Sequence, residues 1–397
     1  MPFNGVSEDY NMNFTPLKDF MDYYIPMLGV PGTDIIIYKD HEEIFRYQSG
    51  YDNLSSGTPV RPDALYHMYS CTKVATCVAA TQLIERGEIL ATDPVYAYLP
   101  EYRNIKVRVK NSDGTESIVP AKNTLTIEHL LTMTGGLDYN LERPGILRVI
   151  KETDGRAPTM DIVRALAEDP FDFEPGTKYQ YSLCLDVIGG IIELVSGQSV
   201  GDYMKNNIFD PLGMTETSFD LDEERIARLA TQYEYAPELG TAREIEKTMN
   251  RFKFGSEYQS TGAGLISSVN DQILLADALT NYGVGKTGNR ILSKAGVELM
   301  RANHLSPEVL KTLSMGQAVG YGYGYGVRTN MDPAAGGNLS PVGEFGWDGA
   351  RGSYLSCDPK NRLAFFYAEH MGGLHPVILP RLRNIVYSCI GGSYEKD

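Results

Sequence analysis

The stretch YSCTKVATCVAATQLIERG, residues 69–87, decides the fold of this chain. After Ser70 the apolar residues recur every three or four positions, which is the spacing of one face of a helix. Gly87 is a natural stop, because glycine is favoured just beyond the end of a helix. The stretch therefore predicts a helix that has Ser70 at its amino terminus and ends before Gly87. Its apolar positions are Val74, Cys77, Val78, Leu83 and Ile84.

Ser70 and Lys73 form a Ser-x-x-Lys pair that could carry acyl-transfer chemistry. Residues three apart lie on the same side of a helix, so the serine Oγ and the lysine Nζ face the same way. The start of the helix adds free N–H groups and the positive end of the helix dipole. A nucleophilic serine needs a proton acceptor and donors for an oxyanion, and this arrangement could supply both. Taken alone, the pattern also describes a helix cap followed by a surface lysine.

Two alternatives for serine chemistry find less support. The G-x-S-x-G pattern of a nucleophile elbow is absent from the sequence. His67 lies three residues before Ser70, but the passage from a strand into the helix would turn it away. We interpret His67 as a histidine of the core or the rim. Lys73 is therefore the better partner for the serine.

The rest of the chain has the pattern of strands, then a long helical block, then strands and a closing helix. Residues 33–52 predict two strands joined by a charged turn, and Asp113-Gly114 marks a hairpin inside the helical block. Both ends of the chain are expected to complete one sheet. Further helices are expected at 126–136, 183–197, 268–282 (capped by Ser268) and 376–389, and further strands at 321–329, 353–357 and 363–368.

This order predicts an α/β (α+β) fold in two parts. The 397 residues are enough for one large core with a sizeable insertion. Residues 1–87 and 241–397 are expected to form a discontinuous sheet domain, and residues 88–240 a mostly helical lobe inserted into it. Clefts tend to lie at the junction of two lobes, so we expect the site there.

Two more segments could complete that site. In PGTKYQYS, residues 175–182, Tyr181 lies at the mouth of a turn, and its phenol could act as a base only beside a cation such as Lys73. FGWDGARGS, residues 345–353, is rich in glycine, so it could line a cleft and offer the Ala350 N–H as a donor. Taken singly, these segments also fit a packed tyrosine and an ordinary turn with a packed indole.

Together and in this order, the three segments resemble the serine β-lactamase and penicillin-binding-protein superfamily, in the branch of class C β-lactamases, D-stereospecific peptidases and family VIII carboxylesterases. The resemblance spans roughly residues 33–368 and includes the runs LTIEHLLTMTGGLDY, FEPGTKYQYS, STGAGLISSVND and GARGSYLSCDP. It implies a β-lactamase/transpeptidase-like fold with a central antiparallel sheet flanked by helices and a mostly helical second lobe. It also implies that Ser70 is the nucleophile, Lys73 the lysine of S-x-x-K and Tyr181 the tyrosine of a Y-x-N element. The N–H groups of Ser70 and Ala350 match the oxyanion hole.

Two elements depart from the superfamily pattern. The Y-x-N element ends in Leu183, so the side-chain amide that contacts the substrate amide in β-lactamases is missing. The K/H-T-G element reads Trp347-Asp348-Gly349, so an indole replaces the lysine that helps to hold a substrate carboxylate. A tryptophan in this place is similar to the W-x-G version of family VIII carboxylesterases. An indole offers apolar contact, and Asp348 would repel a carboxylate if it faced the cleft, so both changes point away from anionic amides.

One residue could reverse this preference. Arg351 could restore a cation for carboxylate binding if its side chain folded into the cleft. The direction of that side chain therefore bears on the class of substrate. The full set of expected substrate contacts is Asn140, Leu183, Trp347, Asp348, Gly349 and Arg351.

Composition limits the partners and the location. Asp and Glu total 51 against 36 Lys and Arg, and the formal charge of −15 repels nucleic acid and anionic lipid. No stretch approaches the roughly 20 apolar residues of a membrane span, and residues 1–14 lack the pattern of a secretory signal. We therefore expect a cytoplasmic protein without a membrane partner. The five scattered cysteines suggest reduced, buried thiols, and the six histidines lack metal-ligand spacing, so neither a metal nor a cofactor is expected.

The sequence thus favours a serine hydrolase that forms an acyl-enzyme, most simply a carboxylesterase acting on short-chain esters. A β-lactamase, a D-amino-acid peptidase or an acyltransferase could use the same Ser-Lys-Tyr site, and a non-catalytic binding protein could have kept the fold. The expected partner is a small molecule, an ester or a β-lactam. The natural ester, the oligomeric state and the choice of Lys73 or Tyr181 as first base stay open.

Overall fold

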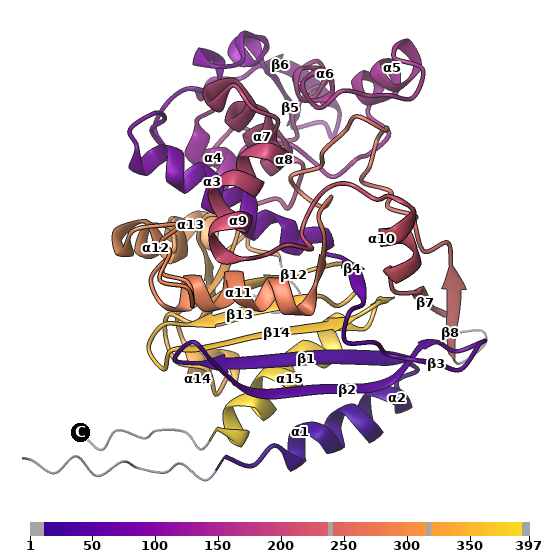
Figure 1. The fold of residues 1–397 in the computed structure, drawn as a ribbon. Helices are drawn as coiled ribbons and strands as arrows, with labels where there is room; N and C mark the ends of the chain where they lie inside the picture. Colours follow the sequence, from indigo (N-terminus) through magenta and orange to yellow (C-terminus); the bar gives the residue numbers. More distant parts are fainter. Residues whose placement is uncertain (1–11, 237–240, 315–318, 391–397) are drawn as a thin grey trace, which may run out of the picture.

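An eight-stranded sheet forms the centre of the computed structural model, which describes residues 12–236, 241–314 and 319–390 (Figure 1). The strand order is β10-β11-β12-β13-β14-β1-β2-β3, and each neighbouring pair is antiparallel. The predicted central antiparallel sheet is confirmed. Its strands are β1 (Gly32–Lys39), β2 (Glu42–Asn53), β3 (Thr58–Pro59), β10 (Tyr321–Tyr323), β11 (Arg328–Asn330), β12 (Phe345–Asp348), β13 (Tyr354–Asp358) and β14 (Leu363–Glu369).

Strand β1 lies inside the sheet because it is apolar on both faces. Ile35 and Ile37 belong to the hydrophobic core on one side of the sheet, and Ile36 belongs to the core on the other side. Ile36 pairs with Phe366 of β14, while the opposite edge of β1 pairs with β2. Both ends of the chain therefore complete one sheet, as the sequence predicts.

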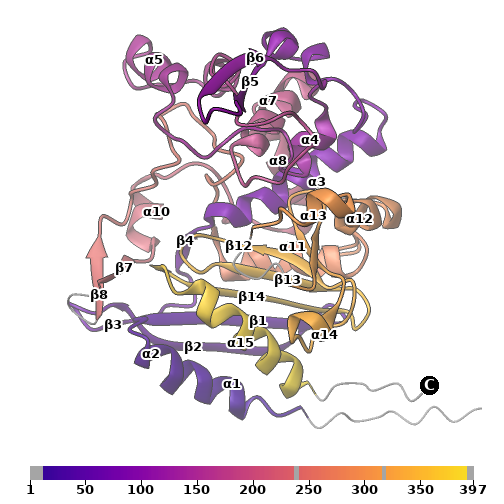
Figure 2. The ribbon, with the colours of Figure 1, turned by 180° about the vertical axis from the view of Figure 1, so that it is seen from behind.

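Helices cover both faces of the sheet. In Figures 1 and 2, α15 and the N-terminal helical run lie against one face, and α11 lies against the other. The core on the side of α15 is the smaller one, and the core on the side of α11 continues into the helical part of the molecule. These helices are α1 (Thr15–Asp19), η1 (Phe20–Tyr24), α2 (Ile25–Met27), α11 (Val269–Thr280) and α15 (His375–Cys389).

A mostly helical part of the chain stands above the sheet in Figure 1. Its central helix α7 packs close to the segment around Thr261, because a Cβ atom at Gly189 would lie only 2.3 Å from Thr261 Oγ1. The core of this part is continuous with the core of the sheet, so the two parts are firmly joined. Its elements are α3 (Thr72–Glu85), η3 (Val95–Ala97), η4 (Pro100–Asn104), β5 (Lys106–Lys110), β6 (Glu116–Pro120), α4 (Ile127–Leu131), α5 (Pro144–Glu152), α6 (Thr159–Ala165), α7 (Cys184–Ser196), α8 (Val200–Met204), η5 (Lys205–Phe209) and α9 (Asp210–Leu212).

Smaller elements connect the helical part with the sheet. Strand β4 pairs with β9, and β7 pairs with β8 and with β15. The predicted division of the chain into 1–87, 88–240 and 241–397 stays a prediction, and its second boundary falls between the paired strands β7 and β8. These elements are β4 (Leu65–His67), η2 (Tyr69–Cys71), α10 (Glu223–Arg228), β7 (Gln232–Ala236), β8 (Thr241–Ile245), β9 (Ile266–Ser268), α12 (Lys294–Arg301), α13 (Pro307–Leu310), α14 (Pro333–Gly336) and β15 (Met371–Gly372).

The helices and strands predicted from the sequence are present, but two of them differ in extent from the prediction. The helix expected at 126–136 ends at Leu131, and two residues later Met133 adopts a positive φ of 57°. The strand expected at 321–329 is two short strands, because Gly324 and Gly326 turn the chain between them. The Asp113-Gly114 hairpin and the Ser268 cap of α11 are present as predicted. The N-terminal helices have no counterpart among the sequence predictions.

The cysteines and the long helices bear on two further expectations. The five cysteines are all buried and unpaired, which agrees with the predicted thiols. Within the described residues, no individual helix has the length and apolar content of a membrane span. Two helices taken together have the length and apolar composition of a span, but the pair is bent by 79° at the break between them. These helices are Cys184–Ser196 and Val200–Leu212.

Candidate active site

Ser70 lies where the chain passes from β4 into helix α3. The short turn η2 carries Tyr69 and Ser70, and the Met68 N–H just before it donates to the Leu265 carbonyl at 2.9 Å. Tyr69 adopts a φ of +45°, in the left-handed region that residues other than glycine rarely enter. Ser70 is 8% exposed and lines a cleft. The predicted nucleophile Ser70 therefore lies at the start of the helix, directly after Tyr69, whose backbone is in the left-handed region.

Lys73 lies one turn further along α3 and is fully buried. Its Nζ donates to Ser70 Oγ at 3.3 Å, to the Tyr139 hydroxyl at 3.0 Å and to the Gly262 carbonyl at 2.7 Å. Burial lowers the pKa of Lys73 to about 8, although the Asp186 carboxylate acts in the opposite direction. A lysine with this pKa carries a fraction of neutral amine near neutral pH, so it can accept a proton.

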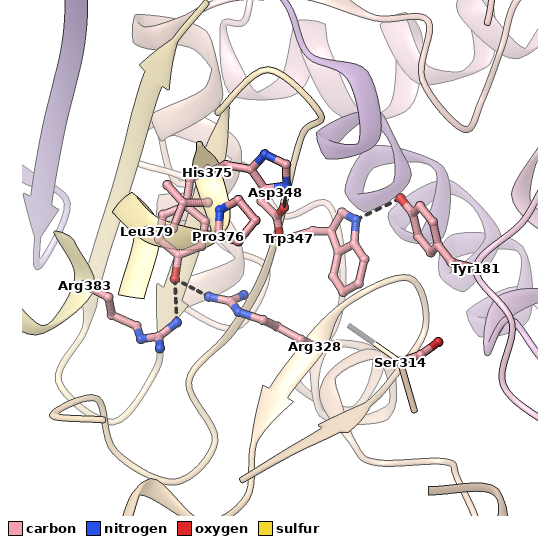
Figure 3. A pocket seen from close by; sticks show the side chains of 10 residues that line it. Tyr181, Ser314, Arg328, Trp347, Asp348, His375, Pro376, Leu379 and Arg383 are labelled. Atoms are coloured by element: carbon pink, nitrogen blue, oxygen red, sulfur yellow. Dashed lines mark hydrogen bonds and ion pairs between the residues drawn. The ribbon is translucent and has the colours of Figure 1, made fainter. Parts of the chain in front are cut away.

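Tyr181 lies against the same amine. The Nζ of Lys73 is 4.6 Å from the centre of the Tyr181 ring, and the indole N–H of Trp347 donates to the Tyr181 hydroxyl at 3.1 Å (Figure 3). Burial raises the pKa of the Tyr181 phenol above its usual range, while hydrogen bonding with Ser70 lowers it to a smaller extent. Tyr181 is therefore a neutral phenol near neutral pH, suited to donate or pass on a proton rather than to start as a base.

Tyr139 is a member of the site that the sequence reasoning missed. Its hydroxyl accepts from Lys73, its ring lies 5.4 Å from the Tyr181 ring between centroids, and it lines the cleft. Hydrogen bonding with Ser70 lowers the pKa of Tyr139, although burial raises it well above the usual value. The run LTIEHLLTMTGGLDY, which ends at Tyr139, is the signal in the sequence that could have indicated this residue; the predicted contact Asn140 is its neighbour. Asn140 also lines the cleft.

The glycine-rich turn after β12 brings Ala350 to the same cleft as Ser70. The Ser353 hydroxyl donates to the Met68 carbonyl at 2.8 Å and so ties this turn to the chain before the nucleophile. A Cβ atom at Gly349 would lie 2.5 Å from that carbonyl oxygen, so only glycine allows the close approach. The predicted oxyanion donors, the N–H groups of Ser70 and Ala350, thus belong to two segments that are held together.

Arg351 turns away from the cleft. Its guanidinium pairs with Glu234 at 2.9 Å, donates to the Tyr233 carbonyl and donates through Nε to the Tyr69 hydroxyl at 3.3 Å. The condition under which Arg351 would bind a substrate carboxylate is therefore not met. The side chain is held by the Glu234 carboxylate of β7, whose position beside Arg351 no motif in the sequence indicates.

Two other predicted contacts also differ from expectation. Leu183 is the residue before helix α7, and its side chain is buried in the main core rather than at the cleft, because the chain turns inward to start the helix. Asp348 faces a smaller cavity beside the cleft, where His375 Nε2 lies 3.8 Å from its carboxylate. Burial raises the pKa of Asp348 above its usual value, against the effect of the neighbouring His375.

The cleft in front of Ser70 has a volume of about 720 Å³. Part of the lining comes from Tyr139 and the residues after it, and another part comes from residues 251–254, which no sequence motif singled out; the rings of Tyr139 and Phe252 pack edge to face at 5.3 Å. Aromatic and aliphatic groups share the rim with the charged side chains of Arg251, Lys253 and Glu142. The lining is Ser70, Tyr139, Asn140, Leu141, Glu142, Ile150, Tyr181, Arg251, Phe252, Lys253, Phe254 and Ala350.

A smaller cavity of about 190 Å³ lies beside the Trp347 indole, and Tyr181 borders both spaces (Figure 3). Arg328 pairs with Glu344 at 2.9 Å, and Arg328 and Arg383 both donate to the Tyr354 hydroxyl. The positive charge at this cavity is thus matched by buried acceptors of the protein. The lining is Tyr181, Ser314, Arg328, Trp347, Asp348, Tyr354, His375, Pro376, Leu379 and Arg383.

The histidines lie outside the reacting groups. His67 is buried, its Nε2 lies 3.0 Å from the Lys247 carbonyl, and its ring stacks on His370. Burial lowers the pKa of His67 to about 4, so it is neutral near pH 7, as fits the core histidine that the sequence favours. Across the described ranges, no group of three or more His, Cys, Asp or Glu side chains is arranged to hold a metal ion.

The fold and the serine–lysine pair define a serine hydrolase of β-lactamase/transpeptidase-like architecture. The chain belongs to the beta-lactamase family, whose pattern matches residues 17–374. The resemblance found in the sequence is thereby confirmed, and it includes the family VIII carboxylesterases and the penicillin-binding-protein homologues.

Three known proteins are similar to this chain over most of its length. Esterase EstB of Burkholderia gladioli is 29% identical over 377 residues, which cover 90% of this chain and 91% of EstB. The structure of EstCE1, a hydrolase with promiscuous acyltransferase activity, has a TM-score of 0.75 at 23% identity and covers 95% of this chain and 98% of its own. A family VIII carboxylesterase has a TM-score of 0.72 at 21% identity, with coverage of 95% and 97%. The family match and these similar proteins together support the conclusion that this protein is a serine hydrolase.

Proposed function

We propose that this protein is a carboxylesterase that cleaves short-chain esters through an acyl-enzyme on Ser70. The observation that carries the proposal is the Lys73 amine, 3.3 Å from Ser70 Oγ and held in a buried site that lowers its pKa to about 8. A serine with a base at this distance is an activated nucleophile. A protein that only binds a ligand has no chemical need for such a pair.

Lys73 acts as the first base in this mechanism. In its neutral form the amine has two N–H donors for the Gly262 carbonyl and the Tyr139 hydroxyl, and its lone pair is left for the Ser70 proton. Ser70 Oγ attacks the ester carbonyl carbon while its proton passes to Lys73 Nζ. The raised pKa of Tyr181 makes a starting phenolate there unfavourable, which supports Lys73 over Tyr181.

The remaining steps return the proton and release the products. The N–H groups of Ser70 and Ala350 hold the negative carbonyl oxygen of the tetrahedral intermediate. The intermediate collapses, the C–O bond to the alcohol breaks, and the alcohol leaves with the proton from Lys73, which Tyr181 can pass on. Water then attacks the acyl-enzyme by the same route, and the acid leaves while Ser70 regains its proton.

The choice of a neutral ester over a β-lactam or a peptide rests on two residues. The Trp347 indole stands where β-lactamases carry a lysine, and its N–H donates to Tyr181 rather than to a substrate. Arg351 is paired with Glu234 and supplies no replacement cation. The similarity to EstB and to a family VIII carboxylesterase supports the same choice.

A rate assay on p-nitrophenyl acetate, butyrate and octanoate, with nitrocefin alongside, tests this proposal. We expect the wild-type protein to cleave the short esters fastest and nitrocefin poorly, and the Ser70→Ala variant to lose the activity. Ser388→Ala is a matched control, because that serine lies on α15, away from the cleft, and its hydroxyl donates to the Ile385 carbonyl of the same helix. Ester cleavage by Ser70→Ala at the wild-type rate would refute the nucleophile, and dominant nitrocefin cleavage would refute the substrate class.

Acyl transfer is a second candidate that the size of the cleft favours. About 720 Å³ beside Ser70 leaves room for an acceptor alcohol next to the acyl group, and EstCE1 is described as a hydrolase with acyltransferase activity. If transfer occurs, added 1-butanol should divert p-nitrophenyl butyrate from butyric acid to butyl butyrate. The absence of butyl ester at high butanol, with hydrolysis intact, would exclude this activity.

A further inference from the structure

Behind the proposed oxyanion donors lies a polar network that connects their two immediate neighbours in the chain. Tyr69 precedes Ser70, and Arg351 follows Ala350. The Nε of Arg351 donates to the Tyr69 hydroxyl at 3.3 Å, and the guanidinium carbon lies 6.0 Å from the centre of the Tyr69 ring. This contact therefore links the immediate neighbours of the two residues whose N–H groups would hold the oxyanion.

Arg351 is anchored on a third segment, strand β7. Its NH2 donates to the Glu234 carboxylate at 2.9 Å, and its NH1 donates to the Tyr233 carbonyl. The Arg351 side chain is 11% exposed, so the guanidinium itself is largely buried, while its partner Glu234 is 41% exposed. The pKa of Glu234 is lowered chiefly by its hydrogen bond with Arg351, as expected for a real charge pair. Strand β7 thus gives the arginine a fixed support.

Tyr69 needs such support because its backbone is strained. A non-glycine residue in the left-handed region costs on the order of 1–3 kcal/mol and persists only where surrounding contacts hold it. The Tyr69 hydroxyl donates to the buried side chain of Gln232. The Gln232 amide in turn donates to the carbonyls of Lys247 at 2.8 Å and Met249 at 2.9 Å. The phenol is thereby fixed from two sides, by Gln232 and by Arg351.

From these contacts we infer that Arg351 is a positioning residue that sets the distance between the Ser70 and Ala350 N–H groups. The inference rests on the proposed function, since it concerns the oxyanion hole of that reaction. Arg351 itself touches no substrate. It holds the strained turn before the nucleophile and the glycine-rich turn after β12 against the same strand.

The fold should survive without this arginine. Ser353 still joins the glycine-rich turn to the Met68 carbonyl, and β12 still pairs with β13. The variant loses the hydrogen bond between Arg351 and Tyr69, the neighbours of the two donor residues. The Ala350 N–H can then shift by a fraction of an ångström relative to the Ser70 N–H. Errors of about 1 Å in a reacting geometry can cost about 100-fold in rate, so a smaller shift should reduce kcat about 10-fold to 100-fold.

The experiment compares Arg351→Met with wild type on p-nitrophenyl butyrate. Arg228→Met is the matched control, because Arg228 also pairs with a carboxylate, Glu216 at 2.8 Å, and donates to a backbone carbonyl, that of Asp63. Arg228 lies on α10 outside the cleft, and its second ion pair, with the Asp63 carboxylate, is longer at 3.8 Å. We expect kcat of Arg351→Met to fall about 10-fold to 100-fold while KM changes less than about threefold. Arg228→Met should keep the wild-type kcat.

Phenylboronic acid gives a second readout that a purely structural role would not change. It binds serine hydrolases as a tetrahedral adduct on the serine Oγ, with an oxygen in the oxyanion hole, so its inhibition constant reports the donors directly. We expect inhibition of Arg351→Met to weaken by about the same factor as kcat falls. An unchanged kcat, or a raised KM with normal kcat and normal boronate inhibition, would overturn the inference.

Tyr69→Phe keeps the inference testable if Arg351→Met does not fold. This variant removes only the hydroxyl that meets Arg351 and Gln232, and it should lower kcat about threefold to tenfold with KM unchanged. A wild-type kcat for Tyr69→Phe would contradict the network. All rates are taken as the part lost in Ser70→Ala, so failure of the proposed function shows as the absence of any Ser70-dependent rate and is distinguished from failure of the positioning role.

Discussion

Replacing Asp186 by asparagine should move the pH dependence of ester cleavage to lower pH. The Asp186 carboxylate is the charge that most raises the pKa of Lys73 against the effect of burial. Its Oδ1 accepts from Tyr258 at 2.7 Å, from Ser260 at 2.9 Å and from the Gly262 N–H at 3.3 Å, while Oδ2 has no hydrogen-bond partner within the part of the chain that the structure describes. Asparagine can keep Oδ1 as the acceptor, so the variant removes a charge and preserves the bonds.

The size of the effect follows from the pKa of about 8 for Lys73. With that pKa, about one tenth of the amine is neutral at pH 7, and the rate rises with pH because the base must be unprotonated. Loss of a nearby opposite charge lowers a lysine pKa by about one unit or more. Half of the amine would then be neutral at pH 7. We expect kcat/KM at pH 7 to rise about fivefold, while the values at pH 9.5 stay equal.

The assay is kcat/KM for p-nitrophenyl butyrate between pH 5.5 and 9.5 at constant ionic strength, for wild type and Asp186→Asn. Asp277→Asn is the matched control, because Asp277 is also buried but pairs with His41 away from the cleft. The control should keep the wild-type midpoint near pH 8. A midpoint that stays in place or moves upward in Asp186→Asn would refute the assignment of Lys73 as the base.

Three further results are expected. Trp347→Phe removes the indole N–H that donates to Tyr181, so kcat should fall about fivefold to tenfold, and an unchanged kcat would argue against a role for that hydroxyl. Burial raises the pKa of Glu369 from 4.5 to about 8, so the wild-type free energy of unfolding should fall as pH rises through that range. In urea titrations, Glu369→Gln should lack this loss and be more stable by about 2 kcal/mol or more at pH 9, and a loss of equal size in both proteins would contradict the reasoning. Gly189→Ala places a Cβ atom 2.3 Å from Thr261 Oγ1 and should lower the free energy of unfolding by about 1–3 kcal/mol, whereas a neutral effect would mean that α7 can shift.

The parts of the site that lie within one short segment could be predicted from the sequence. Ser70 and Lys73 share one turn of one helix, so their meeting needs no knowledge of distant contacts. The sheet could also be anticipated, because the apolar runs of β1 and β14 are local features of the sequence. The place of Tyr181 at the mouth of a turn makes it a candidate, but the resemblance to a family is what favours it over a packed tyrosine.

What could not be predicted depends on contacts between distant segments. Arg351 points away from the cleft because Glu234 of β7 lies beside it. The position of β7 depends on its pairing with β15, and no pattern in the sequence of either strand indicates that pairing. Tyr139 joins the site because its loop passes over Lys73. The cleft wall at residues 251–254 is likewise placed by a loop without a motif.

The pairing of β1 with β14 also determines when this protein can finish folding during synthesis. The ribosome makes β1 and β2 early, but β14, the strand that pairs with the other edge of β1, is made only after the whole helical part. Until then, the backbone groups of an apolar strand stay unpaired and open to other chains. Nascent chains of this protein should therefore depend on chaperones until release, and truncation within β14 should yield aggregates rather than a shortened, folded enzyme.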